Sequence, residues 1–141
     1  MQRAHGRRRS LEVEKPRDGI EALFPLADLL LFSRVYAQGR GYSEPRAFLK
    51  WVQPQAPRAH LVCAWGPRGA YALVPDGGPL HIPAVPPPHV VDTLGAGDVL
   101  NAGIIDRLVR GADLEQALAF GVRLAGKKCG QWGLEGLGGQ D

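Results

Sequence analysis

The chain has 141 residues, which is enough for one domain of ordinary size. With 45% hydrophobic and 22% charged residues, its composition is that of a globular protein and excludes a wholly disordered chain. No apolar run is as long as a membrane span, and the net charge is only +3. We therefore expect a cytosolic protein that contacts neither a membrane nor nucleic acid.

The basic residues gather at the amino terminus. Residues 1–10 carry four arginines, with no aromatic residue among them and no apolar signal core after Met1. Such a cluster is typical of a solvated segment. We predict a disordered basic arm over residues 1–10 and a folded domain over residues 11–141.

The first half of this domain is predicted to alternate strands with helices. Residues 11–14 alternate apolar and polar side chains, as a half-buried strand does, and residues 27–33 form a continuous apolar run that predicts a strand buried on both faces. Between them, Asp18 can cap a short helix through Phe24. A longer helix is predicted to begin at Ser43. The residues on its predicted inward face are Ala47, Phe48, Trp51 and Val52.

The second half begins with two strands, at residues 60–65 and 70–74, which we expect to form a hairpin through a Gly-Pro-Arg-Gly turn. Short strands are predicted at residues 80–82 and 89–91. Two helices follow. One runs from Asp98 to Arg110, and the other begins at residue 113 with the spacing of a capping box. This order of elements predicts an α/β fold, a three-layer α/β/α sandwich with a mostly parallel sheet.

Several potentially reactive side chains have ordinary structural explanations. Cys63 and Cys129 lie in apolar contexts without metal-ligand spacing, so we predict buried thiols. His81 and His89 have no partner at catalytic spacing and are expected at the surface. Lys127 and Lys128 stand near the end of the last helix, where the helix dipole favours cations.

A turn with two glycines joins an apolar segment to the helix that starts at Asp98. Gly95 and Gly97 let the backbone approach a ligand closely, and the first N–H groups of a helix have no intrahelical acceptor, so the turn can bind phosphate. Asp98 would lie beside that phosphate, where an ionised carboxylate can accept the proton of an attacking hydroxyl. The pattern equally allows a structural role, in which Thr93 or Asp92 caps the helix and Asp98 complements its dipole.

The motif Asp-Thr-Leu-Gly-Ala-Gly-Asp at residues 92–98, with residues 101–103, resembles the carboxy-terminal signature of the ribokinase-like (PfkB) carbohydrate kinases. The wider sequence is similar to the fructose-phosphorylating members of that family over residues 11–137. The further matching segments are residues 13–17, 61–65, 86–88 and 125–130. The resemblance implies the carboxy-terminal, ATP-binding half of a ribokinase-like domain.

What the resemblance implies is an ATP-dependent kinase that transfers the γ-phosphoryl group to the C1 hydroxyl of fructose and yields fructose 1-phosphate. Mg²⁺ would bridge the phosphates, family members also use potassium, and the full-length form is expected to be a homodimer. Asp98 is implied to be the catalytic base and to contact the sugar hydroxyl. The residues implied to bind ATP are Gly66, Pro67, Arg68, Gly69, Gly95, Ala96, Gly97 and Asp98.

This sequence departs from the family pattern at two points. Arg34 stands where the fructose kinases have a lysine near the nucleotide phosphates. Complete members are also much longer, and their sugar-binding Gly-Gly-Asn segment and β-clasp lid do not occur here. We therefore expect a truncated chain that is inactive alone. A kinase of another sugar or nucleoside, a non-catalytic nucleotide-binding or interaction module, and a fragment that does not fold stay open as alternatives.

Overall fold

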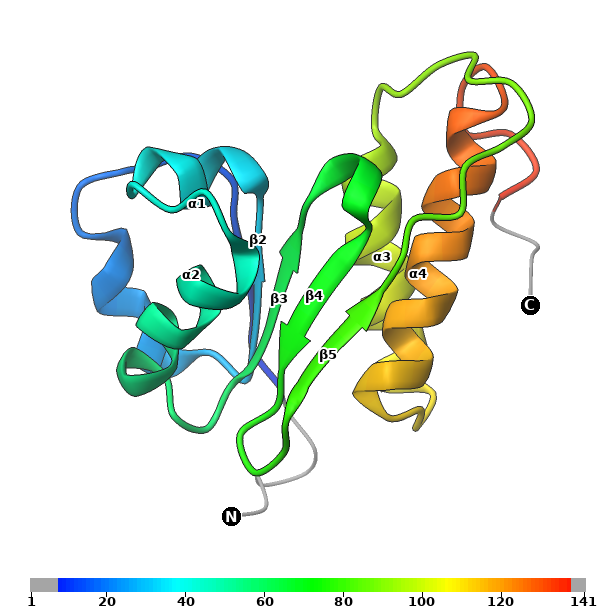
Figure 1. The fold of residues 1–141 in the computed structure, drawn as a ribbon. Helices are drawn as coiled ribbons and strands as arrows, with labels where there is room; N and C mark the ends of the chain where they lie inside the picture. Colours follow the sequence, from blue (N-terminus) through cyan, green and yellow to red (C-terminus); the bar gives the residue numbers. More distant parts are fainter. Residues whose placement is uncertain (1–7, 138–141) are drawn as a thin grey trace. The chain divides into compact units, whose positions relative to one another are not determined.

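The computed structural model describes residues 8–137 and divides into two compact units. The first unit contains the chain up to Trp65 together with Tyr71–His81 (Figure 1). The second unit contains Gly66–Ala70 and the chain from Ile82 onward. The predicted arm over residues 1–10 lies largely outside the described residues.

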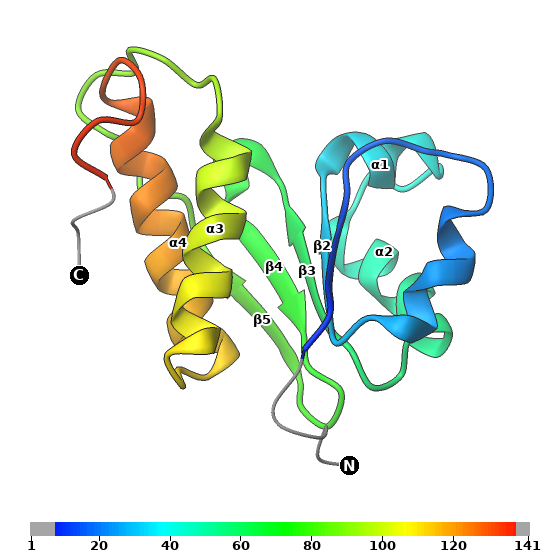
Figure 2. The same ribbon diagram turned by 180° about the vertical axis from the view of Figure 1, so that it is seen from behind.

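A five-stranded sheet in the order β1-β2-β3-β4-β5 is the centre of the first unit. Its strands are β1 (Ser10–Val13), β2 (Leu29–Phe32), β3 (His60–Ala64), β4 (Ala70–Leu73) and β5 (Pro79–Ile82). β1, β2 and β3 are parallel, with Leu30 opposite both Leu11 and Leu61. β3, β4 and β5 follow one another in alternating directions (Figures 1 and 2). The hairpin and the strands predicted up to residue 82 are confirmed.

An aromatic cluster fills the core between this sheet and the helices of the first unit. These helices are the 3₁₀ segment η2 (Ile20–Leu26), α1 (Arg34–Gly39), α2 (Pro45–Val52) and the 3₁₀ turn η3 (Gln53–Gln55). Phe32 of β2 makes edge-on contact with Phe24 at 5.3 Å and with Phe48 at 5.0 Å between ring centroids. Each of these three rings is buried, and such pairs stabilise a core beyond the area they bury.

Two predictions for the first unit are wrong in detail, and one helix was not predicted. The segment after β1 is a 3₁₀ helix whose N-cap is Gly19 at φ 79°, so Asp18 is not its cap. α1 was not expected, and it begins where the Ser33 hydroxyl accepts the Tyr36 N–H at 3.0 Å. On α2, Leu49 is buried and the predicted Ala47 is exposed, because the inward face follows Pro45, Phe48, Leu49 and Val52 at helical spacing.

Two helices, α3 (Ala96–Val109) and α4 (Leu114–Cys129), pack against each other in the second unit (Figure 2). α4 begins at the predicted capping box: the Gln116 N–H donates to Asp113 Oδ1 at 2.8 Å, and the Asp113 N–H donates to Gln116 Oε1 at 3.1 Å. α3 begins two residues before the predicted Asp98.

The strand predicted at residues 89–91 is absent, and this segment has no regular secondary structure. Prolines at residues 86–88 cannot donate backbone hydrogen bonds to a neighbouring strand. The N–H groups of Val91 and Asp92 instead both donate to the Cys129 carbonyl of α4, at 2.7 and 3.1 Å.

Across residues 8–137, no helix combines the length and the apolar character needed to cross a bilayer.

Candidate active site

A backbone turn at the start of α3 forms the centre of the site. Gly95 is the N-cap of α3 with φ 83°, a left-handed conformation that favours glycine. The Ala96 N–H donates to the Thr93 carbonyl at 3.1 Å, and the Val99 N–H donates to the Gly95 carbonyl at 2.9 Å. The first N–H groups of a helix have no intrahelical acceptor, so those that follow Ala96 are available to an anion.

The space over this turn is open. A Cβ built on Gly95 or on Gly97 would meet no atom within 4 Å, and Gly97 and Asp98 are both exposed. Asp98 lies in the first turn of α3, at the positive end of the helix dipole. An anion that binds the free amides would therefore lie close to a carboxylate, which is the juxtaposition that proton abstraction beside a phosphate requires.

Asp92 stabilises the loop before the turn and does not cap the helix. Its Oδ1 accepts the Leu94 N–H at 3.0 Å, two residues along the chain, and α3 has no side-chain cap. The structural alternative that gave Asp92 or Thr93 the role of helix cap is therefore wrong. Asp92 instead fixes the loop one residue before Gly95.

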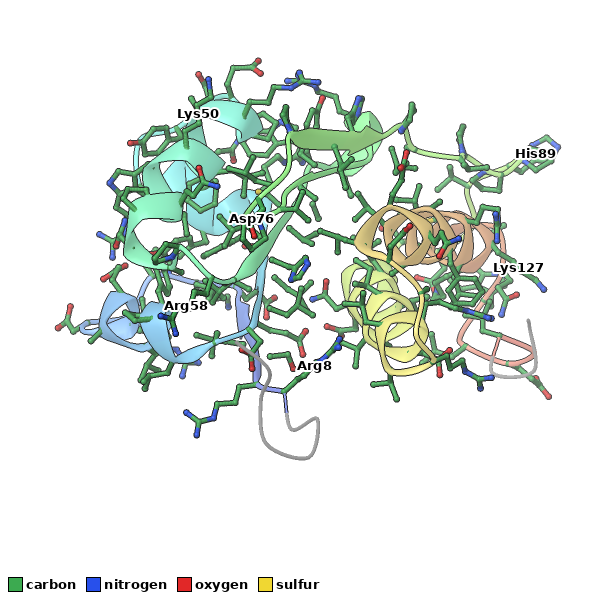
Figure 3. The ribbon with its side chains drawn as sticks, turned by 90° about the horizontal axis from the view of Figure 1, so that it is seen from below. Arg8, Lys50, Arg58, Asp76, His89 and Lys127 are labelled. Atoms are coloured by element: carbon green, nitrogen blue, oxygen red, sulfur yellow. The ribbon has the colours of Figure 1, made fainter. Side chains whose placement is uncertain are left out.

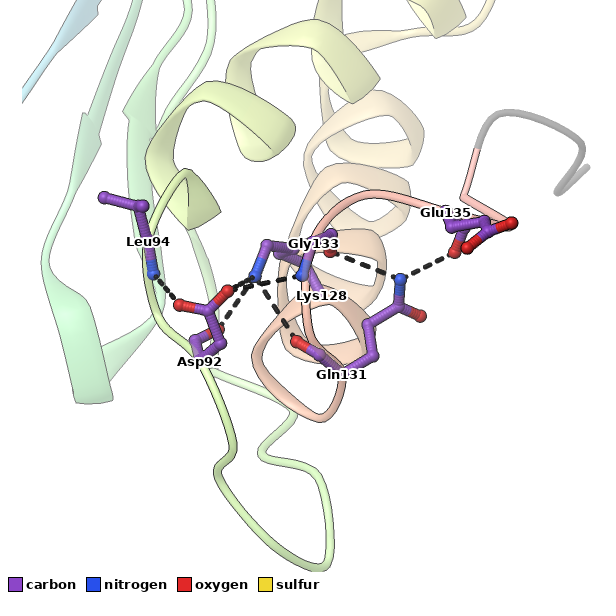
Figure 4. Close-up of polar contacts among 6 residues, drawn as sticks. All are labelled: Asp92, Leu94, Lys128, Gln131, Gly133 and Glu135. Atoms are coloured by element: carbon purple, nitrogen blue, oxygen red, sulfur yellow. Dashed lines mark hydrogen bonds and ion pairs between the residues drawn. The ribbon is translucent and has the colours of Figure 1, made fainter.

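Lys128 of α4 holds Asp92 from the opposite side (Figure 4). Its Nζ donates to Asp92 Oδ2 at 3.0 Å and to the Asp92 carbonyl at 2.9 Å, and it lies 3.5 Å from the Gln131 carbonyl. The Gly133 N–H also donates to Asp92 Oδ2, at 3.3 Å. The hydrogen bond from Lys128, with those from Leu94 and Gly133, lowers the pKa of Asp92 below its usual value.

Glycines of α4 bring the segment before Asp92 into close contact with this helix. A Cβ on Gly126 would lie 1.9 Å from the Val85 carbonyl oxygen, and one on Gly130 would lie 2.8 Å from a Pro87 side-chain carbon. A larger side chain at either glycine would push this segment away. The segment that leads to the turn at Gly95 is thus held by the carboxyl-terminal half of α4, and not by the strand that was predicted there.

The role of Lys128 was not foreseen. The helix dipole accounts for two lysines at a helix end, yet only Lys127 is exposed and points outward (Figure 3), whereas the Lys128 side chain is 1% exposed. The sequence does contain a signal, because Lys128 follows Gly121 and Ala125 at helical spacing and so belongs to the inward face. A charged residue on such a face calls for a buried partner.

The last residue of the Gly66–Gly69 turn must be a glycine for structural reasons. It forms the 3₁₀ turn η4 (Gly66–Arg68) between β3 and β4, closed by the Gly69 N–H on the Gly66 carbonyl at 3.0 Å. Gly69 is buried at φ 91°, and a Cβ there would lie 2.1 Å from the Ile82 carbonyl oxygen. The first three residues of the turn are exposed, so a role of this turn in nucleotide binding stays a prediction.

The structure also describes the remaining candidate residues. Arg34 is exposed at the start of α1, in the first unit. His89 is exposed as predicted (Figure 3), whereas His81 is half-buried and stacks on Tyr71 at 4.0 Å between ring centroids. Cys63 is fully buried, and burial raises the pKa of its thiol to about 12. Within the described part of the chain, no three potential metal ligands of the His, Cys, Asp or Glu types gather.

The sequence of this chain is similar to those of known proteins. Residues 4–136 match the model of the pfkB family carbohydrate kinases. Ketohexokinase of Mus musculus is 44% identical over 129 residues, which are 91% of this chain and 43% of the mouse protein. The chain thus spans less than half the length of that relative.

Solved structures of kinases share the fold. Adenosine kinase from Sinorhizobium meliloti has a TM-score of 0.80 at 22% identity, covering 93% of this chain and 42% of that protein. Ribokinase from Arabidopsis thaliana, solved with ribose and ATP, has a TM-score of 0.73 at 21% identity, covering 88% and 42%. The predicted α/β, ribokinase-like fold class is confirmed, as part of a domain. The chain belongs to the pfkB family of carbohydrate kinases.

Proposed function

We propose that this chain supplies the ATP-binding half and the catalytic base of a kinase that phosphorylates the C1 hydroxyl of fructose. One observation carries the proposal: Asp98 stands in the first turn of α3, directly after an open turn at Gly95 and Gly97. That arrangement combines an anion site made of backbone amides with a carboxylate that can receive a proton.

In the proposed reaction, the amides at the start of α3 bind the phosphate that is transferred and stabilise the charge that develops on it. Asp98 accepts the proton of the sugar hydroxyl as this oxygen attacks the γ-phosphorus of ATP, whose bond to the ADP oxygen breaks so that ADP leaves. The dipole of α3 supports phosphate binding, since its positive end attracts the phosphate. Gly66, Pro67, Arg68 and Gly69 are proposed to border the nucleotide.

The similarity to mouse ketohexokinase supports fructose as the acceptor. The adenosine kinase and the ribokinase that share the fold show that a different acceptor is compatible with it, and their identities of 22% and 21% bear on the fold alone. Transfer to another sugar or to a nucleoside is therefore the result that would correct the substrate while leaving the proposed chemistry in place.

Mg²⁺ fits the site as a partner of the phosphates. Mg²⁺ usually keeps several waters and binds through the substrate phosphates, so the exposed Asp98 carboxylate would stay available to accept the proton. When bound, it would neutralise phosphate charge. Potassium takes carbonyl and carboxylate oxygens, but those of Asp92 and Gln131 surround the Lys128 ammonium, so we assign potassium no position or step. A homodimer and a cytosolic location are proposals that rest on family membership.

Nucleotide binding is the first test. ATP should raise the melting temperature of the 141-residue chain and bind it in calorimetry. Gly97→Ala should weaken ATP binding without destabilising the chain, because its Cβ enters the space open to the phosphate and touches no protein atom. A folded chain that does not bind ATP would contradict the proposed function.

Turnover is the second test. Fructose-dependent ADP release is measured with the chain and, in parallel, with a longer kinase that carries this half. Asp98→Asn should abolish turnover in any form that is active and leave ATP affinity nearly unchanged. Asp76→Asn, at an exposed carboxylate (Figure 3), is the matched control and should change neither. ATP binding without turnover in the chain would identify a nucleotide-binding half-site.

A further inference from the structure

We propose that Lys128 is a positioning residue of the phosphate site that neutralises Asp92. This inference rests on the proposed function, because it concerns the charge that a bound nucleotide phosphate meets. Its ammonium cancels the charge of a carboxylate that the loop needs for its shape.

The contacts of Lys128 are those of a buried cation with a defined set of partners. Its side chain is 1% exposed, and its Nζ faces three oxygens: Asp92 Oδ2, the Asp92 carbonyl and the Gln131 carbonyl. Burying an ammonium is costly unless charged and polar partners surround it. The neighbouring Lys127 reaches solvent instead, so a position at the end of α4 does not by itself require burial.

The ionised Asp92 carboxylate stabilises the loop that leads to the proposed phosphate site. One oxygen of its carboxylate accepts the Leu94 N–H, and the other accepts the Gly133 N–H and the Lys128 ammonium (Figure 4). The carboxylate therefore fixes the residue that precedes Gly95. Without a counter-charge, the same carboxylate would repel an anion bound at the start of α3, only a few residues further along the chain.

Two kinds of role for Lys128 make different predictions. If Lys128 only supports the fold, its loss should weaken binding of every nucleoside and nucleotide alike. If it neutralises Asp92, its loss should weaken binding more for ligands with more phosphate charge, and removal of the Asp92 charge should reverse the effect. The ratio of ATP affinity to adenosine affinity separates these roles.

The experiment measures binding of ATP and adenosine to the 141-residue chain by calorimetry at low ionic strength. Lys128→Met keeps the length of the side chain and its burial but removes the charge. It should weaken ATP binding about tenfold and adenosine binding less than about twofold. Lys127→Met is the matched control and should leave both affinities unchanged.

The double variant Lys128→Met with Asp92→Asn completes the test. It carries neither charge, and an asparagine oxygen can still accept the Leu94 N–H, so ATP affinity should return to within about threefold of the original chain. It also serves as the test if the single variant does not fold: an ATP-to-adenosine ratio near the original supports the inference, and a collapsed ratio overturns it.

The possible failures are distinguishable. If the unsubstituted chain binds no ATP, the proposed function falls and this inference with it. If the unsubstituted chain binds ATP and Lys128→Met binds it equally well, the inference alone is overturned. Equal losses for ATP and adenosine would likewise overturn it, since they would indicate a purely structural lysine.

Discussion

Gly103 of α3 and Gly121 of α4 face each other where the two helices meet. A Cβ on Gly103 would lie 3.1 Å from the Gly121 Cα, so the two backbones are nearly in contact. A Cβ on Gly121 would lie 2.8 Å from the Leu100 carbonyl oxygen and 2.9 Å from a side-chain carbon of Ile104. Because α3 carries Asp98 and α4 carries Lys128, this close packing holds together the two helices that build the candidate site.

Gly121→Ala should therefore destabilise the chain. The added methyl group meets backbone and packed side chains, and overpacking of this kind costs about 1–3 kcal/mol, which outweighs the gain of about 1 kcal/mol from higher helix propensity. Gly97→Ala is the matched control, because this helical glycine has no neighbour within 4 Å and should gain stability. Urea unfolding followed by circular dichroism measures both. Equal stability of the two variants would contradict the packing argument.

Low pH should weaken the Asp92–Lys128 pair. The pKa of Asp92 is lowered in the folded chain. The stability that this carboxylate contributes is therefore complete above its pKa in the unfolded chain, about 3.9, and is lost as the pH falls through its lower pKa in the folded chain. Unfolding free energies of the original chain and of Asp92→Asn should differ most at neutral pH and converge below about pH 4. A gap that is constant from pH 7 to pH 3 would show that ionisation of Asp92 adds no stability to the folded chain.

Most elements could be predicted because their signals are local. The continuous apolar run of β2 and the capping box of α4 depend on neighbouring residues, and both are confirmed. The predicted strand at residues 89–91 failed for a non-local reason. Its apolar residues suit a strand, but the hydrogen bonds of Val91 and Asp92 go to the carbonyl of Cys129, nearly 40 residues later.

The candidate site shows the same division. The glycine turn and the acidic residue that opens α3 could be read from a short motif, since a helix start determines where amides and side chain lie. The support from Lys128 could not, because 36 residues separate it from Asp92. An inward-facing lysine indicates that a buried partner exists, but the sequence does not identify the partner.

The two cysteines should react at very different rates with a thiol reagent. Cys63 is fully buried, and burial raises the pKa of its thiol to about 12, so it presents almost no thiolate at pH 8. Cys129 is half-buried at the end of α4. Ellman's reagent should modify one thiol in the native chain and the second only in urea. Cys129→Ser should remove the native reaction, and its persistence would place the reactive thiol at Cys63.

Stability in alkali should depend on Tyr36, which is fully buried and donates its hydroxyl hydrogen to Glu21. Burial, reinforced by this hydrogen bond, raises the pKa of Tyr36 to about 12. In the unfolded chain the pKa of a tyrosine is about 10, so Tyr36 loses its proton there first. Stability therefore falls as the pH rises from the pKa of the unfolded chain to that of the folded chain.

Tyr36→Phe removes that titration together with the hydrogen bond to Glu21. The variant should be less stable at pH 7 by about 1 kcal/mol, and the gap to the original chain should narrow above pH 10. Tyr42→Phe changes a tyrosine that packs on Phe48 and Trp51, and it controls for general effects of alkali. Urea unfolding at several pH values from 7 to 11 measures the gap. A gap that stays constant would mean that Tyr36 titrates alike in the folded and unfolded chains, because only a difference between the two states makes stability depend on pH.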